Sequence, residues 1–384
     1  MNIRLKIWGL IIIGVLAISW FFLPAENRRT AEPTPEINLE FSDILSTKNE
    51  SFARVYKPRT FVFPQDHGAH PEYRIEWWYF TGNVQTKTKR KFGYELTFFR
   101  FALTPEQIKT PSVWRDNQMY MAHFALTDVN DKKFYVDERT SRAGNGLAGA
   151  SSDHYHVWLH NWKAEAINGN DSNIQLTAKS DDFSIALQLK TQKKVALQGV
   201  DGLSQKSPEP GNASYYYSYT RMATTGHIQI KQKSYEVNGT SWMDREWSSS
   251  ALSKEQSGWD WFALQLSDNS ELMFYQLRRK DGSISLTSSG AVFHADDSKT
   301  DLNLSEVEIK VLDQWISPHT QISYPSKWQL LIPKLGIELT VTPLINDQEL
   351  NVRYRYWEGA VNVTGEKQGQ AILGQGYVEL TGYD

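Results

Sequence analysis

The chain has 384 residues, a formal net charge of −3 and no cysteine. A chain of this length can form two domains, each with its own hydrophobic core, so neither domain needs a metal or a disulfide to fold. No cluster of lysine and arginine follows one face of a predicted element. This excludes nucleic acid as the expected partner, because phosphate binding requires a basic surface.

The first 24 residues are predicted to be an export segment. Arg4 and Lys6 precede an uncharged apolar run at residues 7–23, and positive charge before such a run keeps the N-terminus inside the cell. The run is short for a membrane-spanning helix, but bulky residues occupy the place where a signal peptidase prefers small ones. We therefore expect either an anchor in the inner membrane or a signal peptide that is removed. Both alternatives make the body of the protein periplasmic.

The rest of the chain is expected to be a tether followed by β-structure. Residues 25–60 contain several prolines and charges of both signs, which is typical of a linker. From residue 61 onward, apolar residues mostly alternate with polar ones, and Gly, Asn and Asp interrupt the pattern at short intervals. This predicts antiparallel strands with few, short helices. Roughly eight strands per domain would close an up-and-down barrel without exposed edges.

The β-region contains two copies of one pattern. Residues 260–278 repeat the aromatic and charged pattern of residues 77–100, and further matches downstream keep the same order. Ordered repetition indicates two copies of one structural unit. We therefore predict an all-β protein with tandem barrels at residues 61–250 and 251–384, and we expect the function in their walls or between them.

A segment with two histidines is the first candidate site. His67 and His70 are three residues apart, with Asp66 and Glu76 nearby. Imidazole and carboxylate groups bind metals, but a complete set of ligands is not apparent, and we expect no metal. In the other interpretation, the segment plugs the mouth of a barrel and its imidazoles form hydrogen bonds with backbone and carboxylates.

A tyrosine-rich segment is the second candidate. On a strand, Tyr215, Tyr217, Tyr219 and Arg221 would point to one side, because alternate residues share a face. Three phenols and a guanidinium can hold an apolar ligand and offer it hydrogen bonds. A seam of tyrosines between the two domains is the other interpretation.

The third candidate is a pair of carboxylates beside an indole. Strand alternation places Trp242, Asp244 and Glu246 on one face. If that face is interior, the carboxylates must be paired, for example with Arg221 or Arg100, or shifted toward the protonated form. A raised carboxyl pKa is what general acid catalysis requires near neutral pH. A structural ion pair is the other interpretation.

Several motifs occur in a fixed order along the β-region, at residues 63–70, 76–79, 213–218, 242–247, 258–261 and 356–359. Together they resemble the AttH-like family, which is related to carotenoid 1,2-hydratases. The resemblance implies two lipocalin-like barrels packed together, as the repeat does. It also implies an exported protein that is encoded with ABC transporters whose permeases act on lipids or lipoproteins.

The resemblance also implies which residues would act in a hydratase. The hydratase relatives add water to the terminal double bond of an acyclic carotenoid without a cofactor, and an aspartic acid protonates the alkene. Asp244 occupies the place of that aspartate, but Tyr215 and Tyr217 stand where the relatives have a His-x-Trp motif. In such a mechanism Asp244 would be the acid, and Tyr215, Tyr217 and Trp242 would stabilise the carbocation.

Three functions are therefore expected. The first is a membrane-tethered periplasmic protein that binds a hydrophobic ligand, a lipid or an isoprenoid, beside an ABC transporter permease; it requires an apolar cavity in a barrel. The second is a cofactor-free hydratase of an unsaturated isoprenoid. The third is a partner-docking module without a ligand. For a bound ligand, the expected contacts are Trp77, Trp78, Tyr79, Arg100, Tyr219, Arg221, Glu246, His67 and His70.

Overall fold

The computed structural model describes residues 51–106, 112–250 and 252–383. The segment predicted to be an anchor or signal peptide, residues 7–23, and most of the predicted tether lie outside the described residues. Among the described residues, no helix combines the length and the apolar character needed to cross a membrane. Both sheets belong to one compact unit, Leu39–Asp384.

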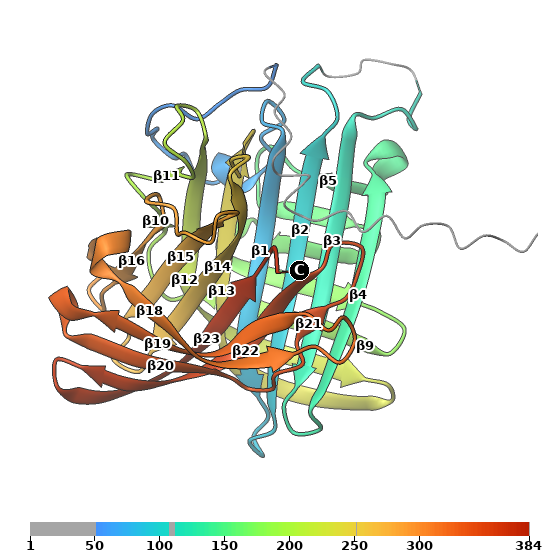
Figure 1. The fold of residues 1–384 in the computed structure, drawn as a ribbon. Coiled ribbons are helices and arrows are strands. Elements are labelled where there is room, and N and C mark those ends of the chain that lie inside the picture. The colour runs from blue at the N-terminus through green and yellow to red at the C-terminus, as the bar shows by residue number, and fades with distance from the viewer. Residues whose placement is uncertain (1–50, 107–111, 251, 384) are drawn as a thin grey trace, which may run out of the picture. The chain divides into compact units, whose positions relative to one another are not determined.

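The first sheet is a nearly closed barrel of 13 strands (Figure 1). Neighbouring strands run antiparallel in the order β4-β3-β2-β1-β13-β12-β9-β8-β7-β6-β5, and β10 and β11 pair with β12. β3 also contacts β5, and β4 contacts β6, so the two ends of the sheet come together. The strands are β1 (Ile75–Gln85), β2 (Lys91–Ala102), β3 (Gln118–Asp128), β4 (Lys133–Arg142), β5 (Ala148–Ala150), β6 (His156–Leu159), β7 (Trp162–Ile167), β8 (Asn170–Lys179), β9 (Phe183–Thr191), β10 (Ala196–Leu197), β11 (Leu203–Gln205), β12 (Ala213–Ile230) and β13 (Lys233–Ser248).

The second sheet has 10 strands and forms a half-barrel. Its order is β17-β16-β15-β14-β23-β22-β20-β19-β18, and β21 pairs with β22. The strands are β14 (Gln256–Leu266), β15 (Glu271–Arg279), β16 (Ser289–Phe293), β17 (Lys299–Asn303), β18 (Glu308–Ile316), β19 (Ser323–Ile332), β20 (Ile337–Pro343), β21 (Glu349–Leu350), β22 (Tyr356–Lys367) and β23 (Gln370–Leu380). The helices described are short 3₁₀ turns: η1 (Gln65–His67), η2 (Gly144–Gly146), η3 (Leu304–Glu306) and η4 (Pro333–Leu335).

The observed sheets confirm the predicted all-β fold class with two barrel-like units. The repeated segments occupy equivalent places, because β1 lies between β2 and β13 as β14 lies between β15 and β23. The expectation of roughly eight strands per unit was too low. Part of the excess is short strands, such as β10 and β11, that pair only with the beginning of the long strand β12.

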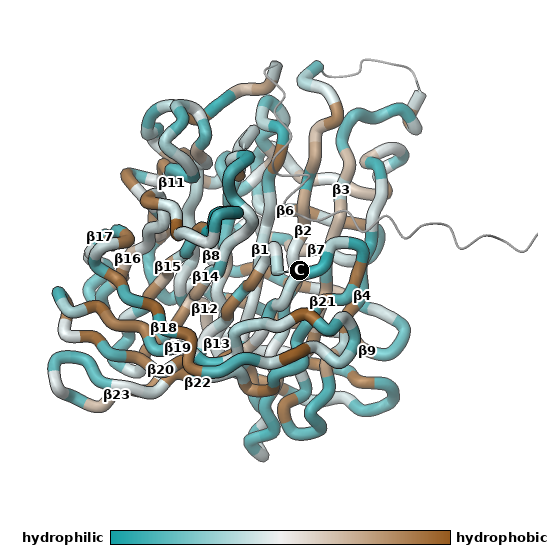
Figure 2. Tube along the Cα trace, in the orientation of Figure 1, coloured by the Kyte–Doolittle hydropathy of each residue, from teal (hydrophilic) through white to brown (hydrophobic). Residues whose placement is uncertain are grey.

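Each sheet buries one face in its own core. Figure 2 shows hydrophobic and hydrophilic positions mixed along the strands, in which successive side chains point to opposite faces. In the first barrel, the core includes Trp78, Phe98, Trp162 and Tyr217. The core of the second sheet is built around residues such as Trp328. Large buried side chains thus fill both interiors.

The opposite faces of the two sheets pack against each other. β1 contacts β23, β2 contacts β22 and β12 contacts β14. The residues between them form a separate apolar cluster that includes Tyr79, Tyr216, Trp261 and Tyr377. This layer between the sheets, rather than either barrel interior, contains the candidate site.

Candidate functional site

Strand alternation directs two carboxylates into the space between the sheets. On β13, Trp242, Asp244 and Glu246 point toward the second sheet, whereas Met243 and Trp247 point into the first barrel. The expectation that these three residues share a face is therefore confirmed. Asp244 and Glu246 are each 4 % exposed, so their charge state depends on their immediate neighbours.

Three hydrogen-bond donors surround the Asp244 carboxyl group. Oδ1 accepts from Ser218 Oγ at 2.5 Å and from Trp242 Nε1 at 2.7 Å, and Oδ2 accepts from Tyr216 OH at 2.5 Å. Burial nevertheless raises the pKa of Asp244 to about 7, against the lowering effect of these donors, and the nearby Glu246 carboxylate adds to the rise. Asp244 therefore exchanges a proton near neutral pH.

Tyr216 connects this carboxyl group to the second sheet. Its hydroxyl donates to Asp244 and accepts a hydrogen bond from Trp261 Nε1 at 3.2 Å. Tyr216 lies on β12 and Trp261 on β14, so the contact crosses between the sheets. Oδ2 of Asp244 has Tyr216 as its hydrogen-bond partner among the described residues, which leaves a lone-pair position for a proton.

Glu246 differs from Asp244 because it is paired with a cation. Lys206 Nζ lies 2.9 Å from Glu246 Oε1, and Ser214 also donates to that oxygen. The same ammonium group lies 4.5 Å from the centre of the Tyr275 ring. Lys206 precedes β12 in a loop. The expected pairing of Asp244 or Glu246 with Arg221 or Arg100 is wrong, and sequence reasoning did not identify Lys206.

A second group of carboxyls faces Asp244 from the other sheet. Glu358 on β22 and Glu379 on β23 are directly opposite each other in the register, where two negative charges would repel. Burial, together with the other carboxylates, raises the pKa of Glu358 well above its usual value, and burial raises that of Glu379 to about 8. Tyr79 OH donates a hydrogen bond to Glu358. Both glutamates therefore favour the protonated form.

Glu95 on β2 is a further buried carboxyl group, and it has no ion pair among the described residues. Both of its carboxyl oxygens, and Oε2 of Glu358, have no hydrogen-bond partner among the described residues. Burial raises the pKa of Glu95 well above its usual value, and Glu379 contributes to the rise. An unpaired buried carboxyl is stable only in its neutral form. Among the described residues, these acids do not form a group that could hold a metal ion.

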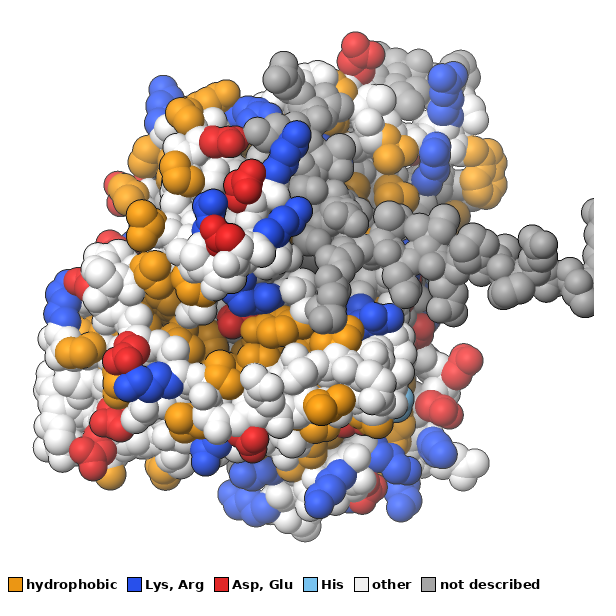
Figure 3. Space-filling model, in the orientation of Figure 1, with side chains coloured by type: hydrophobic (Ala, Val, Ile, Leu, Met, Phe, Trp, Pro, Cys, Tyr) orange, Lys and Arg blue, Asp and Glu red, His pale blue; other side chains and the backbone are white. Residues whose placement is uncertain are grey.

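Aromatic side chains form most of the remaining wall of the pocket. The cavity has a volume of about 80 Å³, several times the roughly 10–15 Å³ that one buried water needs. Figure 3 shows hydrophobic side chains lining a hollow near the centre of this face of the molecule. The residues that line the pocket are Trp77, Tyr79, Thr97, Phe99, Lys206, Tyr216, Asp244, Glu246, Leu252, Trp259, Trp261, Tyr275, Leu277, Tyr356, Glu358 and Glu379.

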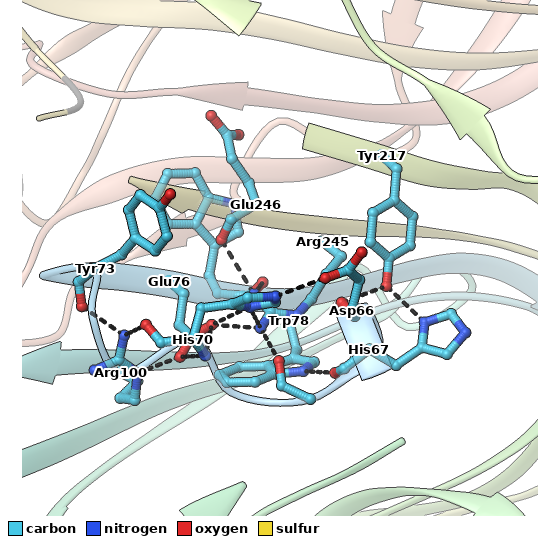
Figure 4. Close-up of polar contacts among 12 residues, drawn as sticks. Asp66, His67, His70, Tyr73, Glu76, Trp78, Arg100, Tyr217, Arg245 and Glu246 are labelled. Atoms are coloured by element: carbon cyan, nitrogen blue, oxygen red, sulfur yellow. Dashed lines mark hydrogen bonds and ion pairs between the residues drawn. The ribbon is translucent and has the colours of Figure 1, made fainter. Parts of the chain in front are cut away.

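The histidine segment plugs the first barrel instead of lining this pocket (Figure 4). His70 lies between two carboxylates, with Nε2 3.1 Å from Asp66 Oδ1 and Nδ1 3.2 Å from Glu76 Oε2. His67 Nδ1 lies 2.6 Å from Tyr217 OH, and Trp78 Nε1 donates to the His67 carbonyl. These contacts match the plug interpretation of the sequence.

Two arginines neutralise the carboxylate at the centre of the plug. Arg100 and Arg245 both form ion pairs with Glu76. Burial alone would raise the pKa of Glu76, but the two arginines hold it well below its usual value. The Arg245 guanidinium also stacks over the Trp78 ring at 3.9 Å. Trp78, Arg100, His67 and His70, all expected to contact a ligand, are thus parts of a packed interior.

The tyrosine segment is divided between the two faces of β12. Tyr215, Tyr217 and Tyr219 point into the first barrel, away from Asp244. A register shift between Tyr219 and Met222 interrupts the alternation. Arg221 consequently turns toward the second sheet, where Nε lies 2.5 Å from Glu271 Oε1. The structure therefore does not place Tyr215 or Tyr217 beside Asp244, whereas Trp77 and Tyr79 line the same pocket as Asp244.

Sequence reasoning missed most of the residues that the second sheet contributes to the pocket. The signal for Trp259 and Trp261 was present, because both belong to the motif at residues 258–261 and Trp261 also lies in the repeated segment. Glu358 belongs to the motif at residues 356–359, but neither Glu358 nor Glu379 was singled out as a candidate site residue. Their proximity depends on the register of β22 and β23 and on the packing of the two sheets, which a single sequence does not reveal.

Comparisons with known proteins agree with this architecture. A protein of Nitrosomonas europaea whose crystal structure bears the AttH name is 35% identical to this chain, with a TM-score of 0.77; the match covers 87% of this chain and 100% of that one. Kievitone hydratase from Nectria haematococca is 14% identical, with a TM-score of 0.65 over 88% of this chain and 95% of its own. CghA, solved with Sch210972, is 12% identical with a TM-score of 0.53, over 88% of this chain and 97% of its own.

The two distant structures share the fold alone, since their identities are low. No curated protein matches the chain. The AttH-like family model matches residues 54–383, which is nearly the whole of the described part. The predicted resemblance is confirmed: the chain belongs to the AttH-like family.

Proposed function

We propose that the protein adds water to a carbon–carbon double bond of an apolar ligand bound between its two sheets, with Asp244 as the proton donor. The observation that carries this proposal is the buried Asp244 carboxyl group, held by three hydrogen-bond donors in a pocket of aromatic side chains. An acid of pKa about 7 has the strength that general acid catalysis needs at neutral pH. The apolar wall suits an alkene, which offers no group for hydrogen bonding.

The reaction requires no cofactor. The Asp244 proton passes to one alkene carbon, and the π electrons form the new C–H bond, leaving a carbocation on the other carbon. The electron-rich faces of Trp77, Trp259 and Trp261 stabilise that cation. A water molecule then forms the C–O bond, and the proton it loses returns to the Asp244 carboxylate. The reverse sequence removes water from the alcohol.

The neighbours of Asp244 position it for this step. Ser218 and Trp242 hold Oδ1, so the proton resides on Oδ2, beside Tyr216. After proton transfer, the same three donors stabilise the carboxylate. Tyr215 and Tyr217, expected to stabilise the cation, have no part in this mechanism because they face the barrel interior. Trp242 retains a role as a hydrogen-bond donor.

The neutral glutamates on the second sheet support the same chemistry. Glu358 and Glu379 line the pocket without adding negative charge near Asp244, so an uncharged ligand can enter. Similarity of fold gives only weak support for hydration. One structural neighbour is named kievitone hydratase, and the family resemblance pointed to carotenoid hydratases. The substrate class proposed is an unsaturated isoprenoid.

Binding of a hydrophobic ligand without turnover is the second candidate. The expected cavity inside a barrel does not support this candidate, because large side chains fill both barrel interiors. The pocket between the sheets supports it instead. Export, attachment to the inner membrane through residues 7–23, and work beside an ABC transporter permease remain proposals from the sequence and the family resemblance. They are compatible with either function.

Mass spectrometry of the reaction products separates the two candidates. The purified protein would be incubated with acyclic isoprenoid alkenes in isotopically labelled water, and the products analysed for a gain of one labelled water. We expect the wild type to form the alcohol, and Asp244→Asn to bind the alkene without converting it. Ligand retained by the wild type with no labelled alcohol would replace the hydratase with the carrier.

A further inference from the structure

Exposed apolar side chains gather in the loops at one end of the first barrel. We call six of them the apolar rim: Tyr56, Val62, Phe63, Val113, Trp114 and Val200. Tyr56 is 67 % exposed, Trp114 63 % and Val200 65 %. Exposed apolar surface that is gathered in one region marks a contact with a membrane or with another protein. Outside this end, exposed large apolar residues of the described chain include Leu312 on β18 and Leu373 on β23.

The strand register places the rim residues at the same end. Ile75, which begins β1, pairs with Ser248 at the end of β13 and with Phe101 near the end of β2. β3 begins opposite the end of β2, and Tyr215 near the start of β12 pairs with Trp247. The loops before β1, between β2 and β3, and before β12 therefore share one end, which is uppermost in Figure 1.

The segment at residues 51–63 combines these apolar groups with positive charge. It contains Arg54, Lys57 and Arg59 and no acidic residue, and Lys57 is exposed. Arg59 is paired with Asp66. Aromatic and aliphatic side chains interleaved with cations suit the surface of an anionic bilayer, where rings enter the headgroup layer and cations meet lipid phosphates.

The chain also enters the described body at this end. Phe52 is buried, and Ser249 Oγ donates to the carbonyl of Ala53, so the start of the segment is fixed beside the end of β13. In the sequence, residues 24–50 separate this point from the apolar run at residues 7–23. The predicted anchor therefore precedes, in the sequence, the part of the chain that enters the body at the rim.

The accessible part of the pocket lies toward the same end. Trp77 is near the start of β1 and Trp259 near the start of β14, and both are half-buried. Tyr79 and Trp261 lie two residues further along the same strands and are buried. A ligand that leaves a bilayer at the rim would therefore meet the outer tryptophans of the pocket before Asp244.

We propose that the apolar rim rests on the surface of an anionic lipid bilayer and turns the pocket between the sheets toward the lipid. The occupant is the bilayer, because cations and exposed aromatic rings gather at this end, where the described chain begins. This orientation would allow an apolar ligand to pass from lipid into the pocket without crossing bulk water. The proposed orientation is the same whether the protein converts the ligand or only carries it.

Single cysteine variants of the full-length protein test the orientation, since the natural chain has no cysteine. Tyr56→Cys, Val62→Cys, Trp114→Cys and Val200→Cys would carry an environment-sensitive fluorophore, and Leu312→Cys and Leu373→Cys provide matched exposed controls. Each protein would be reconstituted in vesicles of phosphatidylethanolamine and phosphatidylglycerol. Lipids with a nitroxide on the acyl chain then quench only fluorophores that enter the bilayer.

We expect quenching at the four rim positions to exceed that at the controls by at least about two-fold, and to weaken when phosphatidylcholine replaces the anionic lipid. Equal quenching at rim and control positions would overturn the proposal. A rim fluorophore that is shielded from water but not quenched by lipid would also overturn it, because the occupant would then be a protein. Neither readout depends on ligand or turnover, so the proposed hydratase and the orientation can fail separately.

Discussion

Two groups of buried carboxyls in this protein have opposite electrostatics. In the plug of the first barrel, two arginines meet Glu76, and its pKa lies well below the usual value. Between the sheets, Asp244 and Glu358 have no ion pair among the described residues, and burial raises their pKa values. The first arrangement fixes a charge and rigidifies the barrel. The second keeps protons available beside an apolar cavity, which identifies it as the candidate site.

The largest expected effect is on turnover by Asp244→Asn. The amide keeps the shape and most hydrogen bonds of the side chain but has no proton to donate. We expect hydration to fall by about 10²–10⁴-fold, the usual contribution of a general acid, while ligand binding persists. Asp66→Asn provides the comparison from the plug, since its carboxyl does not face the pocket. Equal loss in both variants would mean that Asp244 acts only through the fold.

The same substitution should lower stability strongly in the plug and hardly at all between the sheets. Glu76→Gln leaves Arg100 and Arg245 buried without a counter-charge, which we expect to lower the free energy of unfolding by about 3–5 kcal/mol. Glu358→Gln replaces an already neutral carboxyl with a neutral amide of the same shape, so the change should stay below about 1 kcal/mol. Urea unfolding at neutral pH measures both. A large loss from Glu358→Gln would show that its charge is needed.

Stability should fall as the pH rises through the titration of the candidate site. Asp244 and Glu379 have folded pKa values of about 7 and 8, above their usual values of 3.8 and 4.5. Their contribution is thus fully present below about pH 4 and is lost as the pH rises through 7 and 8, at up to about 1.4 kcal/mol per pKa unit. Unfolding midpoints between about pH 5 and 9 should decline in the wild type and flatten in Asp244→Asn/Glu379→Gln.

The plug has the opposite pH dependence. The pKa values of Asp66 and Glu76 are lowered, so their stabilisation is present above about pH 4.5 and is lost as the pH falls through the folded pKa values. Acid should therefore weaken the plug while it leaves the acids between the sheets neutral. A wild type whose stability rises between about pH 6 and 9 would contradict the protonation assigned to the site.

A smaller effect is expected from Tyr216→Phe. The hydroxyl stabilises the Asp244 carboxylate and bridges to Trp261. Its removal should lower turnover by about 10-fold, equivalent to about 1.4 kcal/mol, and move the alkaline limb of the pH–rate profile to higher pH, because the pKa of Asp244 rises. Tyr217→Phe, on the opposite face of β12, is the matched control and should leave the profile unchanged. Similar profiles for both variants would remove Tyr216 from the positioning of Asp244.

Local patterns predicted one wall of the site but not the other. Period-two alternation was enough to put Trp242, Asp244 and Glu246 on one face, because β13 is regular there. It failed for Arg221, because the register shift after Tyr219 turns the strand. Alternation also could not say which face of β12 lies inward, so Tyr215 and Tyr217 seemed as good as Tyr216.

The site residues that were not predicted come together through contacts between distant parts of the chain. Glu358 lines the same pocket as Asp244 only because two sheets with separate cores pack face to face, and Lys206 reaches Glu246 from a loop without periodicity. The repeat did predict that both units exist and that function would lie in their walls or between them. Which acids are neutral depends on which of them form an ion pair, a property of the packed structure.

Infrared spectroscopy of the carboxyl groups tests the central distinction most directly. A protonated carboxyl has a C=O stretching band separate from those of carboxylates. At pH 7, we expect the wild type to show this band, Asp244→Asn and Glu358→Gln each to lose part of it, and Glu76→Gln to leave it unchanged. A wild type without protonated carboxyls at pH 7 would contradict the account, because Asp244 would then have no proton to give.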